Sequence, residues 1–153
     1  MAADDKDLAP LRARIDSIDQ QLLELLAARA EAAQAVGKIK HDVNAPVFRP
    51  ERERQVIDGL IAKNKSLLAA DGITYIWREI MSACRALEAP VRVAYLGPAG
   101  TFSEQAAFAQ FGQSISKVPC SSIDEVFRAV DAGAADFGVA PVENSSEGAI
   151  SRT

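Results

Sequence analysis

The sequence predicts an intertwined dimer of all-α three-helix units over residues 1–89, followed by a truncated α/β segment over residues 90–153. Three observations support this division. A heptad pattern of apolar residues runs through the first helix, the second part alternates short strands with helices, and glycine rises from three residues before Pro90 to six after it. Because proline disfavours helix at the residue before it, we place the boundary at Pro90.

The first helix is expected over residues 8–42, where apolar positions recur alternately four and three residues apart. Such a helix is about 50 Å long, more than a unit of this size can cover. An identical chain is therefore the expected partner, and the contact is a homodimer through this helix. The seam comprises Leu11, Ile15, Ile18, Leu22, Leu25, Arg29, Ala32, Val36 and Ile39.

Two more helices complete the first unit, over residues 50–64 and 72–88. Pro50 suits the first position of a helix, and Asp71 is the expected N-cap of the last helix. After Pro90 the pattern predicts parallel strands in βαβαβ order, with capping boxes at Thr101–Glu104 and Ser122–Glu125. The expected strands are 91–96, 115–118 and 137–142, and the expected helices are 102–111 and 123–132.

Composition excludes several classes of function. The net charge of −4 argues against a nucleic-acid partner, and no apolar run is long enough to cross a membrane. Cys84 and Cys120 stand in unrelated contexts that make neither a metal motif nor a disulfide framework. We therefore expect a cytoplasmic protein without metal or cofactor.

Charged residues interrupt the apolar faces, and they carry the functional signal. Arg29 occupies a seam position, and Lys40, eleven residues later, points within about 20° of the same direction. A buried cation needs an anionic partner, which is either a protein carboxylate or a ligand. Both alternatives remain open at this point.

Other charges border the same interior. Arg52 and Glu53 lie at the start of the second apolar face, and Glu88 continues the inward face of the third helix. Arg12 points about 100° away from Arg29, so in a dimer it could serve the partner's pocket. The single histidine, His41, lies at a helix end. Without a serine–histidine pair, metal cluster or cofactor loop, this set favours a site that binds a polyanion and stabilises charge separation.

Two sets of motifs stand out in the sequence. The first comprises Leu11-Arg12, Ile15-Asp16-x-x-Asp19, Leu22-Leu23-x-Leu25-Leu26-x-x-Arg29, Val36-Gly37-x-x-Lys40 and Arg52-Glu53. The second comprises Gly97-Pro98-Ala99-Gly100-Thr101-Phe102-Ser103 and Pro141-Val142-Glu143-Asn144-Ser145-Ser146-x-Gly148. Residues 8–89 resemble the all-helical type of chorismate mutase, and residues 91–153 resemble the start of prephenate dehydratase. Their order is similar to the N-terminal part of the bifunctional chorismate mutase–prephenate dehydratase family of phenylalanine biosynthesis.

The first resemblance implies that chorismate rearranges to prephenate in a site shared by two chains. Arg29 and the partner's Arg12 would bind the two substrate carboxylates. Lys40 and a protonated Glu88 would donate to the ether oxygen, while Glu53 would hold the substrate hydroxyl.

The resemblance leaves three neighbouring positions with weaker assignments. Arg52 would support the cluster. Cys84 stands where relatives have a serine near a carboxylate, so a weaker thiol donor would replace a hydroxyl there. Arg49 stands where relatives have an aspartate, and it receives no role.

The second resemblance implies a periplasmic-binding-protein-like fold with a prephenate site between two lobes. Its remnants here would be Gly100, Thr101, Ser103, Asn144 and Ser145. A glycine-rich turn before a helix is also suited to binding an anion. Because the later catalytic motif of that family is absent, we expect no dehydratase activity from this chain alone.

Two other classes of function remain as alternatives. The helices could form a non-catalytic dimerisation or interaction module, in which Arg29 pairs with a protein carboxylate. The α/β segment could be a fragment of an anion-binding sensor that uses the glycine-rich turn.

Overall fold

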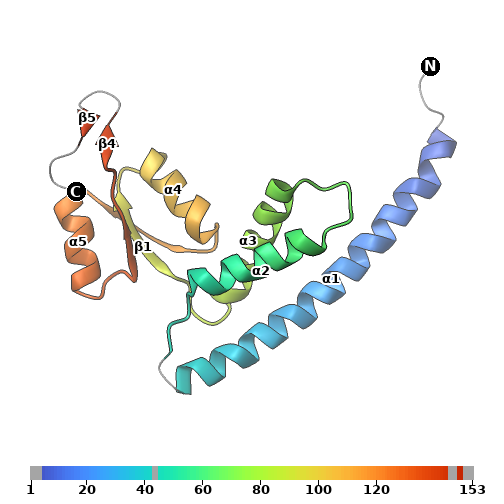
Figure 1. Cartoon of the computed structure of the whole chain (residues 1–153), viewed down its shortest axis with the longest axis horizontal. Helices are drawn as coiled ribbons and strands as arrows, with labels where there is room; N and C mark the ends of the chain where they lie inside the picture. Colours follow the sequence, from blue (N-terminus) through green and yellow to red (C-terminus); the bar gives the residue numbers. More distant parts are fainter. Residues whose placement is uncertain (1–4, 43–44, 145–147, 150–153) are drawn as a thin grey trace.

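Three helices form the N-terminal part of the chain in a computed structural model that describes residues 5–42, 45–144 and 148–149. They are α1 (Asp5–Asp42), α2 (Pro50–Lys63) and α3 (Ala70–Ala86). Helices α2 and α3 pack on each other, and α1 packs against α3. Figure 1 shows that α1 diverges from the other two helices toward its N-terminal end.

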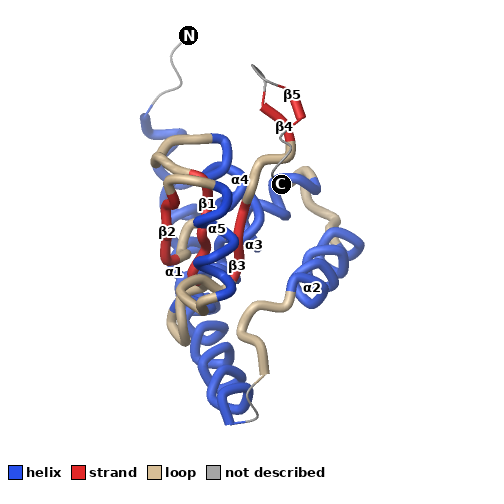
Figure 2. Tube along the Cα trace, turned by 90° about the vertical axis from the view of Figure 1, so that its left-hand side faces the viewer, coloured by secondary structure: helices blue, strands red, loops and turns tan. Residues whose placement is uncertain are grey.

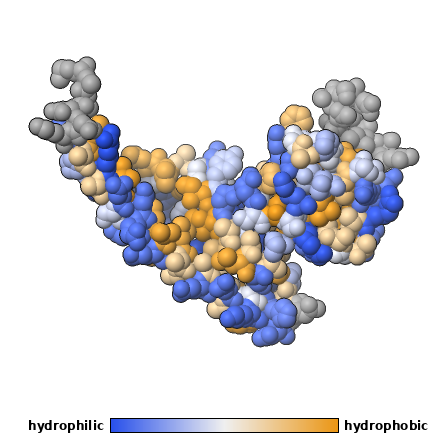
Figure 3. Space-filling view, turned by 180° about the vertical axis from the view of Figure 1, so that it is seen from behind, coloured by the Kyte–Doolittle hydropathy of each residue, from blue (hydrophilic) through white to orange (hydrophobic). Residues whose placement is uncertain are grey.

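The apolar seam of α1 remains exposed in the single chain. Ile15 keeps 57% of its surface exposed and Leu25 keeps 67%, and Ile39 near the other end keeps 66%. Figure 3 shows apolar side chains gathered along the helical half of the molecule. At 38 residues, α1 is about 57 Å long, so the two shorter helices cannot cover it.

The helix starts follow local chemistry with one correction. Pro50 begins α2, as predicted, because its missing N–H is not needed in the first turn. The predicted N-cap role of Asp71 is wrong. Helix α3 begins at Ala70 after Ala69, which makes no side-chain cap, and Asp71 lies in the first turn. A carboxylate there still interacts favourably with the helix dipole.

The strands that follow pair in parallel, as the βαβαβ pattern predicts. They form a three-stranded sheet whose order is β2-β1-β3. The strands are β1 (Arg92–Leu96), β2 (Ser116–Cys120) and β3 (Phe137–Val139). Helices α4 (Phe102–Phe111) and α5 (Ile123–Asp131) complete this α/β segment. Two short strands, β4 (Glu143–Asn144) and β5 (Gly148–Ala149), pair antiparallel beyond it.

Proline explains two corrections to the predicted strands. Strand β3 ends at Val139 rather than at residue 142, since Pro141 has no N–H to donate to a ladder. Strand β2 extends to Cys120 through Pro119, because β2 is an edge strand and proline is tolerated there.

Helices α4 and α5 lie on opposite faces of the sheet (Figure 2), and the core of the α/β segment has one layer under each helix. Under α4, Val93 packs with Ala107 and Phe111. Under α5, Ala94 packs with Val126 and other small side chains. Successive residues of β1 therefore point to opposite helices, as strand geometry requires.

Both predicted capping boxes form, but in each box the hydrogen bond to the glutamate side chain comes from a different residue than in the standard box. The hydroxyls of Thr101 and Ser122 accept from the N–H groups of Glu104 and Glu125, at 3.4 Å and 3.2 Å. Each glutamate, however, accepts from the residue before the N-cap, with Gly100 N donating to Glu104 Oε2 at 2.6 Å. In the standard box the glutamate would accept from the N-cap itself.

Glu104 joins three parts of the α/β segment, so we expect it to make the segment acid-sensitive. Its carboxylate accepts from Gly100, from the Tyr95 hydroxyl at 2.9 Å and from Lys117 at 3.3 Å. The bond from Gly100 and the bond from Tyr95 lower the pKa of Glu104 below its ordinary value of 4.5. Because the pKa of this group is lower in the folded state, the ionised carboxylate stabilises the fold at pH values above the ordinary pKa. This stabilisation is lost as the pH falls through the lowered pKa.

Glu104→Gln should therefore have a lower free energy of unfolding than wild type at pH 7, and the difference should shrink toward pH 3. Urea unfolding of both proteins at a series of pH values measures this difference. A difference that stays constant from pH 7 to pH 3 would contradict the assignment.

Candidate active site

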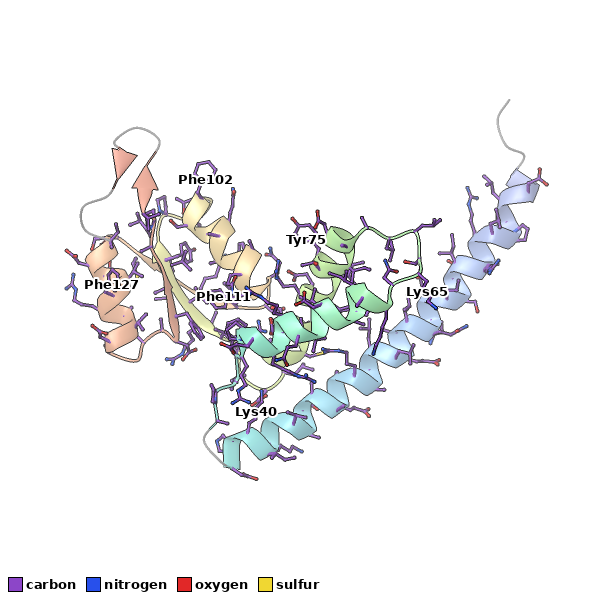
Figure 4. The ribbon with its side chains drawn as sticks, in the orientation of Figure 1. Lys40, Lys65, Tyr75, Phe102, Phe111 and Phe127 are labelled. Atoms are coloured by element: carbon purple, nitrogen blue, oxygen red, sulfur yellow. The ribbon has the colours of Figure 1, made fainter. Side chains whose placement is uncertain are left out.

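A cavity of about 320 Å³ lies among the three helices, and we call it the central cavity. Helix α1 supplies Arg29 and Lys40, the start of α2 supplies Arg52 and Glu53, and α3 supplies Cys84. Lys40 lies beside the segment that leads into α2, where its Nζ donates to the Val47 carbonyl at 3.2 Å (Figure 4). The other lining residues are Ala32, Ala33, Val36, Val47, Arg49, Met81 and Arg85.

The central cavity is strongly cationic. Five arginine or lysine side chains and one carboxylate line it, and the carboxylate is that of Glu53. Within the described part of the chain, Arg29 has no ion pair. The protein-carboxylate alternative for Arg29 therefore finds no support in the described residues, and the space beside it suits an anionic ligand.

Arg85 was not predicted as a site residue, yet it is the partner of Glu53. Its Nη1 forms an ion pair with Glu53 Oε1 in which both side chains are largely buried. Burial lowers the pKa of Arg85 to about 10, so the guanidinium stays charged at neutral pH. The sequence does carry a signal for Arg85. Its position four residues after Met81 and three before Glu88 places it on the edge of the inward face of α3, next to predicted site residues.

Two predicted site residues lie elsewhere in the single chain. Arg12 is an exposed residue of α1 and does not line the central cavity; the 17 residues to Arg29 correspond to about 25 Å of helix. Glu88 lines a separate cavity of about 720 Å³ with Lys38 and His41. A Cβ atom added to Gly37 would come within 2.3 Å of Glu88 Oε2, so this carboxyl group lies directly against the backbone of α1.

The glycine-rich turn is already occupied by a protein group. The Gly100 N–H donates to Glu104, and the Thr101 hydroxyl donates to the Leu96 carbonyl at 3.1 Å. Ser103 is half-buried in the first turn of α4. The backbone of Asn144 belongs to β4, but its side chain and Ser145 lie outside the described residues. The turn therefore gives the sensor alternative little support.

Two features are absent from the residues that the structure describes. No group of three or more histidine, cysteine, aspartate or glutamate side chains is placed to hold a metal ion in this part of the chain. None of the described helices combines the length and apolar character needed to cross a membrane.

Comparison with known proteins identifies the helical part. The sequence profile of chorismate mutase type II matches residues 11–89, about half of the chain. The chain belongs to the type II chorismate mutase family. We call residues 11–89 the mutase unit. The profile of prephenate dehydratase matches residues 93–153.

Relatives share both parts in the same order. The bifunctional chorismate mutase/prephenate dehydratase of Pseudomonas aeruginosa is 51% identical over 99% of this chain and 43% of its own length. That of Stutzerimonas stutzeri is 50% identical over 95% of this chain and 41% of its own. The chain thus spans less than half the length of these curated relatives.

A solved structure supports the fold of the mutase unit. Form II of the chorismate mutase from Thermus thermophilus aligns with a TM-score of 0.53 and 27% identity, covering 54% of this chain and 93% of that one. The predicted helical chorismate mutase fold, followed by a small parallel sheet, is therefore confirmed.

Proposed function

We propose that the chain converts chorismate to prephenate in the central cavity of the mutase unit. One observation carries this proposal: three cationic residues that the resemblance assigns to the site, Arg29, Lys40 and Arg52, converge on one cavity, and Arg29 lacks a counter-ion in the described part of the chain. Chorismate is a dicarboxylate, so it supplies the missing negative charge. The reaction is pericyclic and proceeds without a covalent intermediate, so it requires no nucleophile from the protein.

The mechanism we propose rests on positioning and on charge stabilisation. Holding both carboxylates favours the folded substrate conformer in which the new C–C bond can form. Negative charge grows on the ether oxygen as its C–O bond breaks. Lys40 is the proposed donor to that oxygen, and a donor set in a site that excludes water stabilises this charge strongly. Glu53 is the proposed acceptor for the substrate hydroxyl.

The second substrate carboxylate requires a second chain in this proposal. Arg29 is the proposed partner of one carboxylate, and the partner's Arg12 is the proposed partner of the other. A second copy packed along α1 would cover the exposed seam, and an α1 of about 57 Å is long enough to bring Arg12 to the other copy's cavity. We therefore propose that the chain acts as a homodimer.

Glu88, Cys84 and Arg52 complete the proposed site. Glu88 would donate to the ether oxygen when protonated, and this role requires its carboxyl group to leave Gly37 for the central cavity. Cys84 is buried at the cavity wall, where its thiol would face a carboxylate. Arg52, exposed at the start of α2, would add to the positive field.

The proposal extends to the α/β segment and to the cell compartment. We propose that this segment corresponds to the first part of a periplasmic-binding-protein-like dehydratase domain and is inactive on prephenate by itself. Both cysteines are free thiols, which is consistent with the cytoplasmic location that we propose.

An assay for loss of chorismate by absorbance tests the activity. The wild-type chain should consume chorismate and release prephenate, which acid converts to phenylpyruvate for independent detection. Lys63→Ala is the matched control, since Lys63 is exposed at the last turn of α2 and does not line the central cavity, and it should retain wild-type turnover. A folded chain that consumes no chorismate would overturn the proposal and favour the non-catalytic interaction module.

A further inference from the structure

Arg85 connects the central cavity to the α/β segment through three contacts. One guanidinium nitrogen pairs with Glu53 at the cavity. A second nitrogen, Nη2, donates to the Phe111 carbonyl at 2.6 Å. The guanidinium carbon also lies 4.7 Å from the centroid of the Phe48 ring. Phe111 is the last residue of α4, where the helix dipole favours a cation, and it lies where α4 meets the helices (Figure 4).

These contacts belong to a wider junction between α3 and the end of α4. Residues 79, 82 and 85 are three apart and therefore share one side of α3. The Glu79 carboxylate accepts from Gln113 N at 3.1 Å, and the Ser82 hydroxyl accepts from Ser114 N at 3.2 Å. Ser82 is almost fully buried, so this junction is a packed surface and Arg85 has little freedom within it.

Phe48, in the segment between α1 and α2, packs against this junction. Its ring lies 5.1 Å from that of Phe111 and 5.4 Å from that of Phe137, inside the core under α4. The residues on either side of Phe48 line the central cavity. The segment that leads into α2, and hence to Glu53, is therefore anchored in the α/β segment.

We propose that Arg85 is a positioning residue for the mutase reaction, through which the α/β segment sets the orientation of the Glu53 carboxylate. The inference rests on the proposed function, in which Glu53 holds the substrate hydroxyl. With Arg85 in place, one Glu53 oxygen is engaged and the other is available to accept from the substrate. Without Arg85, the carboxylate has Arg52 and Arg49 as alternative partners in the cavity wall.

A double-mutant cycle on the full chain tests the inference. Arg85→Met keeps the length of the side chain but removes the charge and both hydrogen bonds. It should lower kcat/KM for chorismate on the order of tenfold to a hundredfold, because misplacing a binding group by about an ångström has effects of that size. In the Glu53→Ala background the same change should cost no further activity, because no carboxylate remains to be oriented.

A second variant changes the junction at the end of α4 and leaves Arg85 itself intact. Gly112 follows α4 with a φ of +80°, and a Cβ atom there would meet Ser82 Cβ at 2.4 Å. Gly112→Ala should therefore displace the end of α4 and lower kcat/KM in the wild-type background, but not in the Glu53→Ala background. Lys63→Met removes a positive charge from the exposed end of α2, does not touch the central cavity and should change neither.

The outcomes separate this inference from the proposed function. Non-additive losses between residues 85 and 53, with circular dichroism showing a folded chain, support it. Equal losses in both backgrounds would mean that Arg85 serves the fold alone, and would overturn it. A wild-type chain without mutase activity would overturn the proposed function, and this inference with it.

Discussion

Replacing Arg29 by alanine should reduce kcat/KM for chorismate by about two to three orders of magnitude and leave the melting temperature close to that of wild type. Loss of a donor to a transition-state oxyanion costs on the order of 3–4 kcal/mol, and we expect a similar cost for loss of this carboxylate partner. Folding should suffer little, because Arg29 has no ion pair within the described residues and removing an uncompensated inward charge can even stabilise a protein.

Steady-state kinetics and thermal melting of the same preparation check both halves of this expectation. Arg29→Lys is the informative companion variant, since it keeps the charge but loses the two-point geometry that a guanidinium offers a carboxylate. It should recover part of the lost activity. A variant with near-normal turnover and a markedly lower melting temperature would instead support the interaction module, in which the charges of the seam are structural.

The sequence predicts part of the candidate site because the mutase unit is built from regular helices. Helical periodicity alone places Arg29 and Lys40 on one side of α1, and both line the central cavity in the structure. Arg52 and Glu53 lie where the apolar face of α2 begins, at the same cavity. For these residues, local geometry is sufficient.

What the sequence does not predict depends on contacts between distant segments. Arg85 meets Glu53 across 32 positions and Phe111 across 26, and no local pattern encodes either pairing. The position of Glu88 against Gly37 likewise follows from how α1 and α3 approach each other. The Asp71 prediction was wrong because a cap depends on where the backbone enters the helix, and several nearby residues suit the first turn equally well.

Two inactive variants should restore activity when they are combined, if Arg12 serves the other copy's cavity. Arg12→Ala should be nearly inactive, since each site would lose one carboxylate partner, and Arg29→Ala should be nearly inactive for the reason given above. In a mixed dimer, one site combines the intact Arg29 of the first chain with the intact Arg12 of the second. The other site lacks both arginines.

Random assortment of equal amounts makes half of the dimers mixed, and each mixed dimer holds one intact site of two. The mixture should therefore reach about a quarter of wild-type activity after unfolding and refolding together. Sedimentation analysis of the wild-type chain should give the mass of two chains, which is the control for the assembly itself. A mixture of Arg14→Ala, another variant of α1, with Arg29→Ala is the control. Arg12 is intact in both chains of this mixture, so its activity shows the effect of losing Arg29 alone from one of the two chains.

An isolated chain cannot reproduce this restoration, because about 25 Å of helix separates residues 12 and 29 within it. A mixture that stays as inactive as its components, despite sedimenting as a dimer, would show that Arg12 does not act across the dimer. Restoration would instead require that the exposed seam of α1 is covered by a second copy, since that packing is what brings the partner's Arg12 to the cavity. The same experiment thus tests the assembly and the shared site together.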